Sequence, residues 1–125
     1  MKKYLEYLKL LPKAIPNFDK LIEGWVNDLK LNNNQLSEDQ VGEIVRRRTI
    51  CFACPLNSDN AKTSQEYKDL YGENYQTDRT EPHCAACGCP ILKKTASLSS
   101  SCGLESYNNE NPDNTQELRW INYND

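Results

Sequence analysis

The sequence predicts a mainly α-helical protein in which N-terminal helices precede a small cysteine-rich module and an extended or short-helical C-terminal tail. Apolar residues recur at helical spacing over the first 50 residues. All six cysteines fall between positions 51 and 103, in an arrangement that includes two Cys-x-x-Cys units. We therefore expect a helical segment over residues 1–50, a cysteine-rich module over residues 51–103 with a polar insertion at 57–83, and a polar tail over residues 104–125.

Length and composition restrict the classes of function. The chain has 125 residues and a formal net charge of −3, which suits one small domain. It has no apolar run near the roughly 18 residues of a membrane helix. Its N-terminus lacks the pattern of a secretory leader, so we expect a product of the cytoplasm with reduced thiols. It has no Ser/His/Asp set, no glycine-rich phosphate loop and no histidine-based open metal site, so we do not expect an enzyme.

Two helices are expected before residue 32. A stripe of apolar residues at positions 4, 5, 8 and 11 predicts a first helix that ends before Pro12. Asn17 then suits the N-cap of a second helix over residues 18–29. The apolar residues of this second helix share one face, which we expect to be its buried side: Phe18, Leu21, Ile22, Trp25, Val26 and Leu29.

A third helix is expected to begin after Ser37. The pair Ser37 and Gln40 has the form of a capping box. The buried side of this helix should carry Val41, Ile44 and Val45. The run Arg46-Arg47-Arg48 should lie in its last turn, where cations suit the helix dipole.

Two shorter features are expected further along the chain. Ser64 could cap a short helix in which Tyr67, Leu70 and Tyr71 share a face, and Gly72 would end it. The tail carries Leu118, Trp120, Ile121 and Tyr123. We expect the tail to dock on an external protein surface with Trp120 and Tyr123 as anchors, because aromatic residues carry much interface energy. The alternative is that Trp120 closes the small core of the chain itself.

The cysteine spacing predicts a structural zinc site. Cys51-x2-Cys54 is followed after 29 residues by Cys84-x2-Cys87-x-Cys89, and Cys102 follows 12 residues later. Two cysteines three apart in a tight turn can direct both sulfurs at one ion, and Gly88 suits a turn position with positive φ. Zinc prefers tetrahedral sulfur sites, and four thiolates leave no open position for catalysis.

Six cysteines exceed the four ligands that one zinc needs. Our first choice is Cys51, Cys54, Cys84 and Cys87, with Cys89 and Cys102 as alternative ligands or inert buried thiols. A two-zinc cluster with bridging thiolates, a set of disulfides and an iron–sulfur cluster are the other interpretations.

Basic residues near the cysteines raise a nucleic-acid alternative. Arg46-Arg47-Arg48 and Lys93-Lys94 could form a local basic patch. A zinc-ribbon factor acting in transcription or genome packaging would use such a patch on phosphates. The net negative charge of the chain weakens this interpretation, and a solvated helix end is the simpler reading of the arginine run.

The cysteine motifs resemble a known family. The segments that carry the resemblance are Arg48-Thr49-Ile50-Cys51-Phe52-Ala53-Cys54-Pro55, Cys84-Ala85-Ala86-Cys87-Gly88-Cys89-Pro90-Ile91-Leu92-Lys93-Lys94 and Cys102. Over residues 46–103 the chain is similar to small phage-encoded, cysteine-rich, zinc-binding proteins. In that family a Pro and a Trp often follow the last cysteine, whereas here Gly103 follows.

The resemblance implies a place of action. The amino-acid composition of the chain, rich in Asn, Lys and Tyr, resembles that of proteins of crAss-like phages. This implies a minor structural protein of the virion, made in the host cytoplasm and docked in multiple copies on capsid or portal-vertex subunits of a symmetric assembly.

Overall fold

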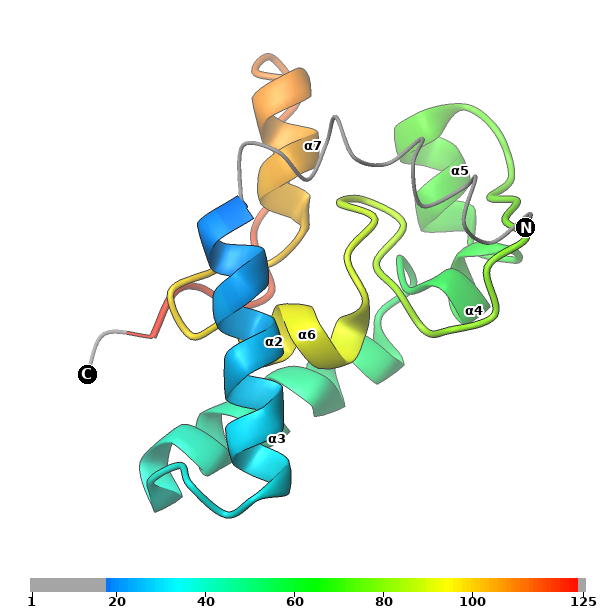
Figure 1. Cartoon of the computed structure of the whole chain (residues 1–125). Helices are drawn as coiled ribbons and strands as arrows, with labels where there is room; N and C mark the ends of the chain where they lie inside the picture. Colours follow the sequence, from blue (N-terminus) through cyan, green and yellow to red (C-terminus); the bar gives the residue numbers. More distant parts are fainter. Residues whose placement is uncertain (1–17, 124–125) are drawn as a thin grey trace.

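The computed structural model describes residues 18–123, apart from the side chains of residues 18, 19 and 21. The helix expected over residues 4–11 lies outside the described residues. Figure 1 shows a mainly helical protein, as the sequence predicts. The helices are α2 (Phe18–Asn32), α3 (Glu38–Ala53), α4 (Ser58–Ala61), α5 (Gln65–Tyr71), α6 (Ile91–Ala96) and α7 (Leu104–Glu110). None of these helices is long and apolar enough to cross a membrane.

The cysteine-rich segment of the fold is built from turns and short helices. Its extended pairings, within the part of the chain that the structure describes, are two isolated antiparallel bridges, Asn57 with Cys84 and His83 with Pro90. The two strands of a regular zinc ribbon are therefore not formed here. The short helix expected in the insertion is confirmed as α5, because Ser64 caps it and Gly72 ends it with a φ of 81°.

Helix α2 packs along α6, and α6 also contacts α3 (Figure 1). The face that α2 presents to α6 contains Gly24, Asn27 and Asp28, all buried. A methyl group at Gly24 would collide with the carbonyl of Lys93, so the two backbones lie in direct contact. The Asn27 side chain donates to the carbonyl of Ala96 at 2.8 Å.

The predicted inner face of α2 is therefore wrong for the side chains that the structure describes. Four of the expected core residues are between 43% and 61% exposed: Ile22, Trp25, Val26 and Leu29. The reason is that the contact with α6 consists of a glycine and polar groups that meet backbone carbonyls. Helical periodicity identifies the apolar side of a helix, but it does not identify the side that a neighbouring helix will cover.

Helix α3 begins at the predicted cap and ends later than expected. Ser37 Oγ accepts from the Gln40 amide at 3.2 Å, and Gln40 Oε1 accepts from the Ser37 amide at 3.0 Å, so the capping box is confirmed. Ile44 is fully buried as expected, whereas Val45 is 55% exposed. Because the helix continues to Ala53, the arginine run lies in its interior and not in its last turn.

Arg47 is the largest of the fully buried side chains that the structure describes. Its exposed fraction is 0%, and its guanidinium lies 4.4 Å from the ring centroid of Trp120. It donates to one carboxylate and three backbone carbonyls, those of Glu43 (2.8 Å), Ser97 (2.9 Å), Leu98 (3.1 Å) and Ile121 (3.1 Å). The interpretation of the arginine run as a solvated helix end is therefore wrong at Arg47.

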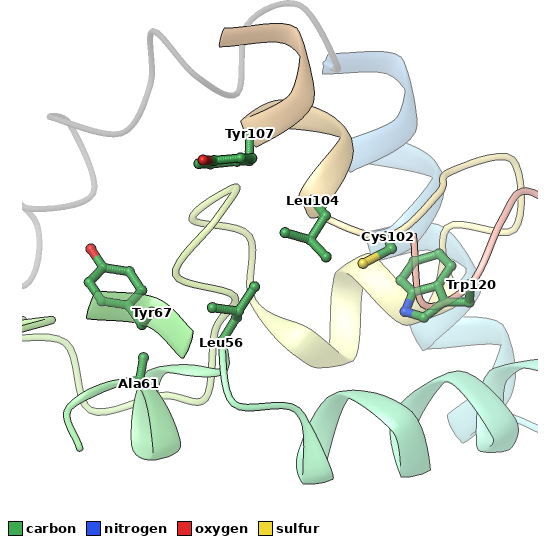
Figure 2. Close-up of a cluster of buried hydrophobic side chains, with 7 residues drawn as sticks. All are labelled: Leu56, Ala61, Tyr67, Cys102, Leu104, Tyr107 and Trp120. Carbon is green, nitrogen blue, oxygen red and sulfur yellow. The ribbon is translucent and has the colours of Figure 1, made fainter. Parts of the chain in front are cut away.

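Within residues 18–123, the buried hydrophobic side chains form two clusters. Figure 2 shows the larger one, which contains Leu56, Ala61, Tyr67, Cys102, Leu104, Tyr107 and Trp120. The smaller one contains Ile44, Ala96 and Leu98, with Tyr123 packed against it. Trp120 is only 3% exposed. The expectation that Trp120 anchors an external surface is wrong, and the alternative that it closes the chain's own core is confirmed.

We predict that Arg47→Ala lowers the free energy of unfolding by about 3–5 kcal/mol, because three carbonyls and the Glu43 carboxylate lose a buried donor. Urea denaturation measures this loss. The control is Arg46→Ala. The Arg46 side chain is 52% exposed and forms an i,i+3 ion pair with Glu43, so its loss should cost less than about 1 kcal/mol. Equal losses for the two variants would contradict the role given to Arg47.

We predict that Asp28 makes stability depend on pH in the acid range. Burial alone would raise the pKa of Asp28, but hydrogen bonds and charges from Lys93 and Arg48 outweigh it and hold the pKa below its usual value. The carboxylate therefore adds stability above its unfolded pKa of about 3.9, and this stability is lost as pH falls through the lower folded pKa.

The measurement is urea denaturation of the natural chain and of Asp28→Asn between pH 7 and pH 3. Asp28→Asn should be the less stable chain at pH 7, and the gap should narrow as the medium becomes acidic. Asp113→Asn, which changes an exposed residue, is the control and should follow the natural chain. A gap for Asp28→Asn that does not change with pH would contradict the prediction.

Candidate metal centre

Cys51 and Cys54 lie at the C-terminal end of α3. Cys51 belongs to its last turn, and Cys54 is its C-cap residue, whose amide donates to the Cys51 carbonyl at 3.2 Å. The amide of Leu56 donates to Cys54 Sγ at 3.4 Å. Trp120 Nε1 donates to Cys51 Sγ at 3.3 Å. Both sulfurs thus accept hydrogen bonds of the kind that stabilise a thiolate.

The second cysteine group forms a tight turn. The Cys84 amide donates to the Cys89 carbonyl at 2.9 Å, and the Gly88 amide donates to the Cys84 carbonyl at 2.6 Å. Gly88 has a φ of 78°, as the sequence predicts. Within the turn, the Cys87 amide donates to the Cys84 sulfur and the Cys89 amide donates to the Cys87 sulfur. These amide donors favour the thiolate at both sulfurs, but the contact with Cys87 and burial together still raise the pKa of Cys84.

Asn57 holds the two cysteine groups together, and sequence reasoning did not identify it. Its side chain donates to the carbonyls of Cys51 (2.9 Å) and Phe52 (3.0 Å), at the end of α3. Its backbone forms the bridge to Cys84. Beside it, the Ala85 amide donates to the Leu56 carbonyl at 2.8 Å. The sequence offers one indication of a role for Asn57: asparagine is a favoured N-cap residue, and Asn57 caps α4.

Cys102 and Gly103 bring a third segment to the same place. The Cys102 amide donates to the Trp120 carbonyl at 2.9 Å, which ties the start of α7 to the C-terminal segment. A Cβ atom at Gly103 would lie 2.6 Å from Cys84 Sγ and 2.8 Å from Cys87 Sγ. The backbone of residue 103 therefore touches both sulfurs, and only a residue without a side chain allows this approach.

One small cavity gathers four of the six cysteines. It has a volume of about 20 Å³, close to the space that one water molecule or small ion occupies. The cysteines that line it are Cys51, Cys54, Cys84 and Cys102. Of the four zinc ligands that we preferred from the sequence, Cys51, Cys54 and Cys84 line this cavity and Cys87 does not. Cys102 lines it as the fourth cysteine. Cys87 is in contact with Cys84, while Cys89 Sγ faces the Cys87 carbonyl at 3.9 Å.

All six cysteines are free thiols in this structure. Among the side chains of the described residues, no group of three or more His, Cys, Asp or Glu is arranged so that it could hold a metal ion. The thiols are instead hydrogen-bonded to their neighbours: Cys84 and Cys89 donate to Cys87, and Cys51 accepts from Trp120. The cavity therefore brings the thiols together without aiming their sulfurs at one point.

The surroundings of Cys51, Cys54 and Cys84 favour neutral thiols, whereas those of Cys87 favour the thiolate. Burial raises the pKa of Cys51 to about 11 and also raises that of Cys54. The pKa of Cys87 is lowered because its sulfur accepts hydrogen bonds from Cys84 and then from Cys89. Burial would lower the pKa of Lys94, but the charges of Cys87 and Cys89 outweigh this and raise it. The thiols can ionise together only if a further positive charge enters.

His83 is not available as a ligand. It is fully buried, and both of its ring nitrogens have partners. Nδ1 lies 2.9 Å from the Glu81 carbonyl, and Nε2 lies 2.5 Å from the Tyr75 hydroxyl. The histidine therefore supports the turn before Cys84 structurally.

The comparisons with known proteins give no relative: no protein-family model, no curated protein and no solved structure matches this chain. The thiol cavity is therefore the feature of this chain that points to a function.

We predict that Gly103→Ala destabilises the fold by about 1–3 kcal/mol, because the new methyl group overpacks the site against two sulfurs. The matched control is Gly42→Ala in α3, where a Cβ atom meets nothing within 4 Å. That substitution should be neutral or should stabilise the helix by up to about 1 kcal/mol. Thermal unfolding of both variants measures the difference. If Gly103→Ala proves as stable as Gly42→Ala, the close approach described here is wrong.

Proposed function

We propose that this protein is a structural adaptor and not an enzyme, and that one zinc ion bound by its cavity thiols joins its cysteine-bearing segments. The observation that carries the proposal is the cavity lined by Cys51, Cys54, Cys84 and Cys102. These residues come from the end of α3, the turn after residue 83 and the start of α7. A single ion in this cavity would cross-link segments that are otherwise held by a thin core.

Zinc suits this site by ligand type and by charge. It prefers tetrahedral sulfur coordination and has no redox chemistry of its own. Zn²⁺ with four thiolates carries a net charge of −2, and the side chains of Lys94 and Arg119 on the cavity wall bring positive charge toward it. A site closed by four thiolates has no position for a substrate, so its role is structural.

The proposed ligands are Cys51, Cys54 and Cys102, with the fourth from the turn that contains Cys84 and Cys87. Amide donors to Cys54, Cys84 and Cys87 are already in place, so binding requires the sulfurs to turn inward and the thiol protons to leave. Cys89 is not among the residues that line the cavity, and we assign it no ligand role.

We extend the proposal to a place of action on the strength of the family resemblance. The adaptor would be a minor component of a phage virion that docks in multiple symmetric copies on capsid or portal-vertex subunits. Val45 and Phe52 lie seven residues apart on one side of α3 and are 55% and 47% exposed. They supply apolar contact area for such docking in place of the buried Trp120.

Three of the five basic residues that the nucleic-acid alternative would use are engaged within the fold. Arg47 is buried, and Arg48 and Lys93 both form ion pairs with Asp28. A particle reconstruction that places symmetric copies of this chain on virion subunits would support the adaptor. DNA binding that falls steeply with salt would instead favour the alternative.

We predict one zinc ion per chain, measured by elemental analysis of protein purified without added metal. Cys51→Ser and Cys102→Ser should reduce the bound zinc and unfold the segment over residues 51–103, because structural zinc contributes about 10–16 kcal/mol in small zinc-binding peptides. Cys89→Ser is the matched control and should keep its zinc. A metal-free chain that is fully folded, or Cys102→Ser protein that keeps both zinc and thermal stability, would overturn the proposal.

A further inference from the structure

The outer face of α2 is an exposed apolar stripe. It consists of Ile22, Trp25, Val26 and Leu29, which are 46%, 47%, 43% and 61% exposed. Figure 1 shows α2 in front of α6, on the outside of the molecule, and α2 makes most of its contacts with α6. A contiguous apolar patch that contains a tryptophan and runs along one helix is typical of an interaction surface.

We propose that two copies of this chain associate through this stripe, with their α2 helices packed antiparallel about a twofold axis. A twofold dimer uses the same surface on both copies, so that surface must complement itself. The cysteines of the candidate zinc site lie on other elements and take no part in the contact. The proposal is therefore independent of the adaptor function.

The stripe complements itself in this arrangement. Its four residues are placed symmetrically about the midpoint between Trp25 and Val26. With the twofold axis at that midpoint, Ile22 of one copy lies opposite Leu29 of the second copy, and Trp25 lies opposite Val26. Every apolar residue of the stripe then meets an apolar residue, and each indole packs against a smaller side chain.

The charges along one edge of the stripe favour the same arrangement. Glu23 and Lys30 lie on that edge, seven residues apart. Lys30 is exposed and has no ion-pair partner within residues 18–123. Glu23 Oε1 accepts from Ser97 and Ser99, whereas Oε2 accepts no hydrogen bond from the described residues. Across the axis, Lys30 lies within about 3 Å of Glu23 of the second copy along the helix direction, so two symmetric ion pairs can form.

The opposite edge of the stripe carries a paired charge and therefore does not keep the copies apart. Lys93 of α6 lies there, 4.6 Å from the ring centroid of Trp25, and forms an ion pair with Asp28. This contact holds the Trp25 ring in place before the second copy binds, which lowers the entropy lost on association. One helix per copy gives a small interface, below about 1,200 Å², so we expect a dissociation constant in the micromolar range.

Sedimentation equilibrium of the full chain, from micromolar to submillimolar concentration, tests the proposal. We expect a monomer–dimer equilibrium that Leu29→Gln weakens by about tenfold or more, because each substitution acts twice in a symmetric interface. Lys30→Glu should weaken it by about threefold or more, because two ion pairs become two like-charge contacts. The matched control is Lys68→Glu, which also changes an exposed lysine in the last turn of its helix and should leave the equilibrium unchanged.

Acrylamide quenching of tryptophan fluorescence identifies the face that the dimer buries. Trp120 is 3% exposed and Trp25 is the other tryptophan, so quenching reports mainly on Trp25 and should fall as the dimer forms. A chain that stays monomeric at every concentration would overturn the proposal, and shielding of Trp25 in that monomer would show that the chain covers the stripe itself. A dimer that neither substitution weakens would lie on another face and would also overturn it. Weakening by Leu29→Gln alone would overturn the antiparallel arrangement.

Discussion

The buried guanidinium of Arg47 is the interaction on which the arrangement of the described segments depends. It joins α3 to the turn after α6 and to the C-terminal segment, through the carbonyls of Ser97, Leu98 and Ile121. Burial lowers the pKa of Arg47, while the neighbouring Glu43 carboxylate opposes this and helps the charge to remain inside. A buried charge is tolerated only when it is paired and hydrogen-bonded in this way.

Arg47 also connects the helical part to the thiol cavity. Its guanidinium lies over Trp120, and the indole Nε1 of Trp120 donates to Cys51 Sγ. The carbonyl of the same tryptophan accepts from the Cys102 amide. One indole thus positions two cysteines from distant parts of the sequence. The charge, the ring and the thiols form a single chain of contacts, so a disturbance at any one of them reaches the cavity.

The sequence could predict features that depend on local chemistry. The capping box at Ser37, the helix stop at Gly72 and the positive φ of Gly88 each follow from residues within a few positions. The cap, the helix stop and the turn are confirmed because each is specified by its own few residues. Cysteine spacing predicted that Cys51, Cys54, Cys84 and Cys87 bind one zinc ion. The first three of them line one cavity, and zinc binding stays a prediction.

Features that depend on distant partners could not be predicted in this way. Nothing local to Arg47 indicates that carbonyls fifty and seventy-four residues away will surround it. The sequence around Gly103 does not indicate that two cysteine sulfurs pack against it in the folded chain.

Periodicity identified the apolar side of α2 correctly, but α6 packs on the opposite side. There, the Asn27 side chain donates to the Ala96 carbonyl, and Gly24 leaves room for the Lys93 carbonyl. Helix α2 is consequently a two-sided element, with a polar and glycine-containing contact inward and an aromatic stripe outward. A helix built in this way leaves Trp25 and its apolar neighbours exposed, and a contiguous apolar patch of this kind favours contact with a further surface.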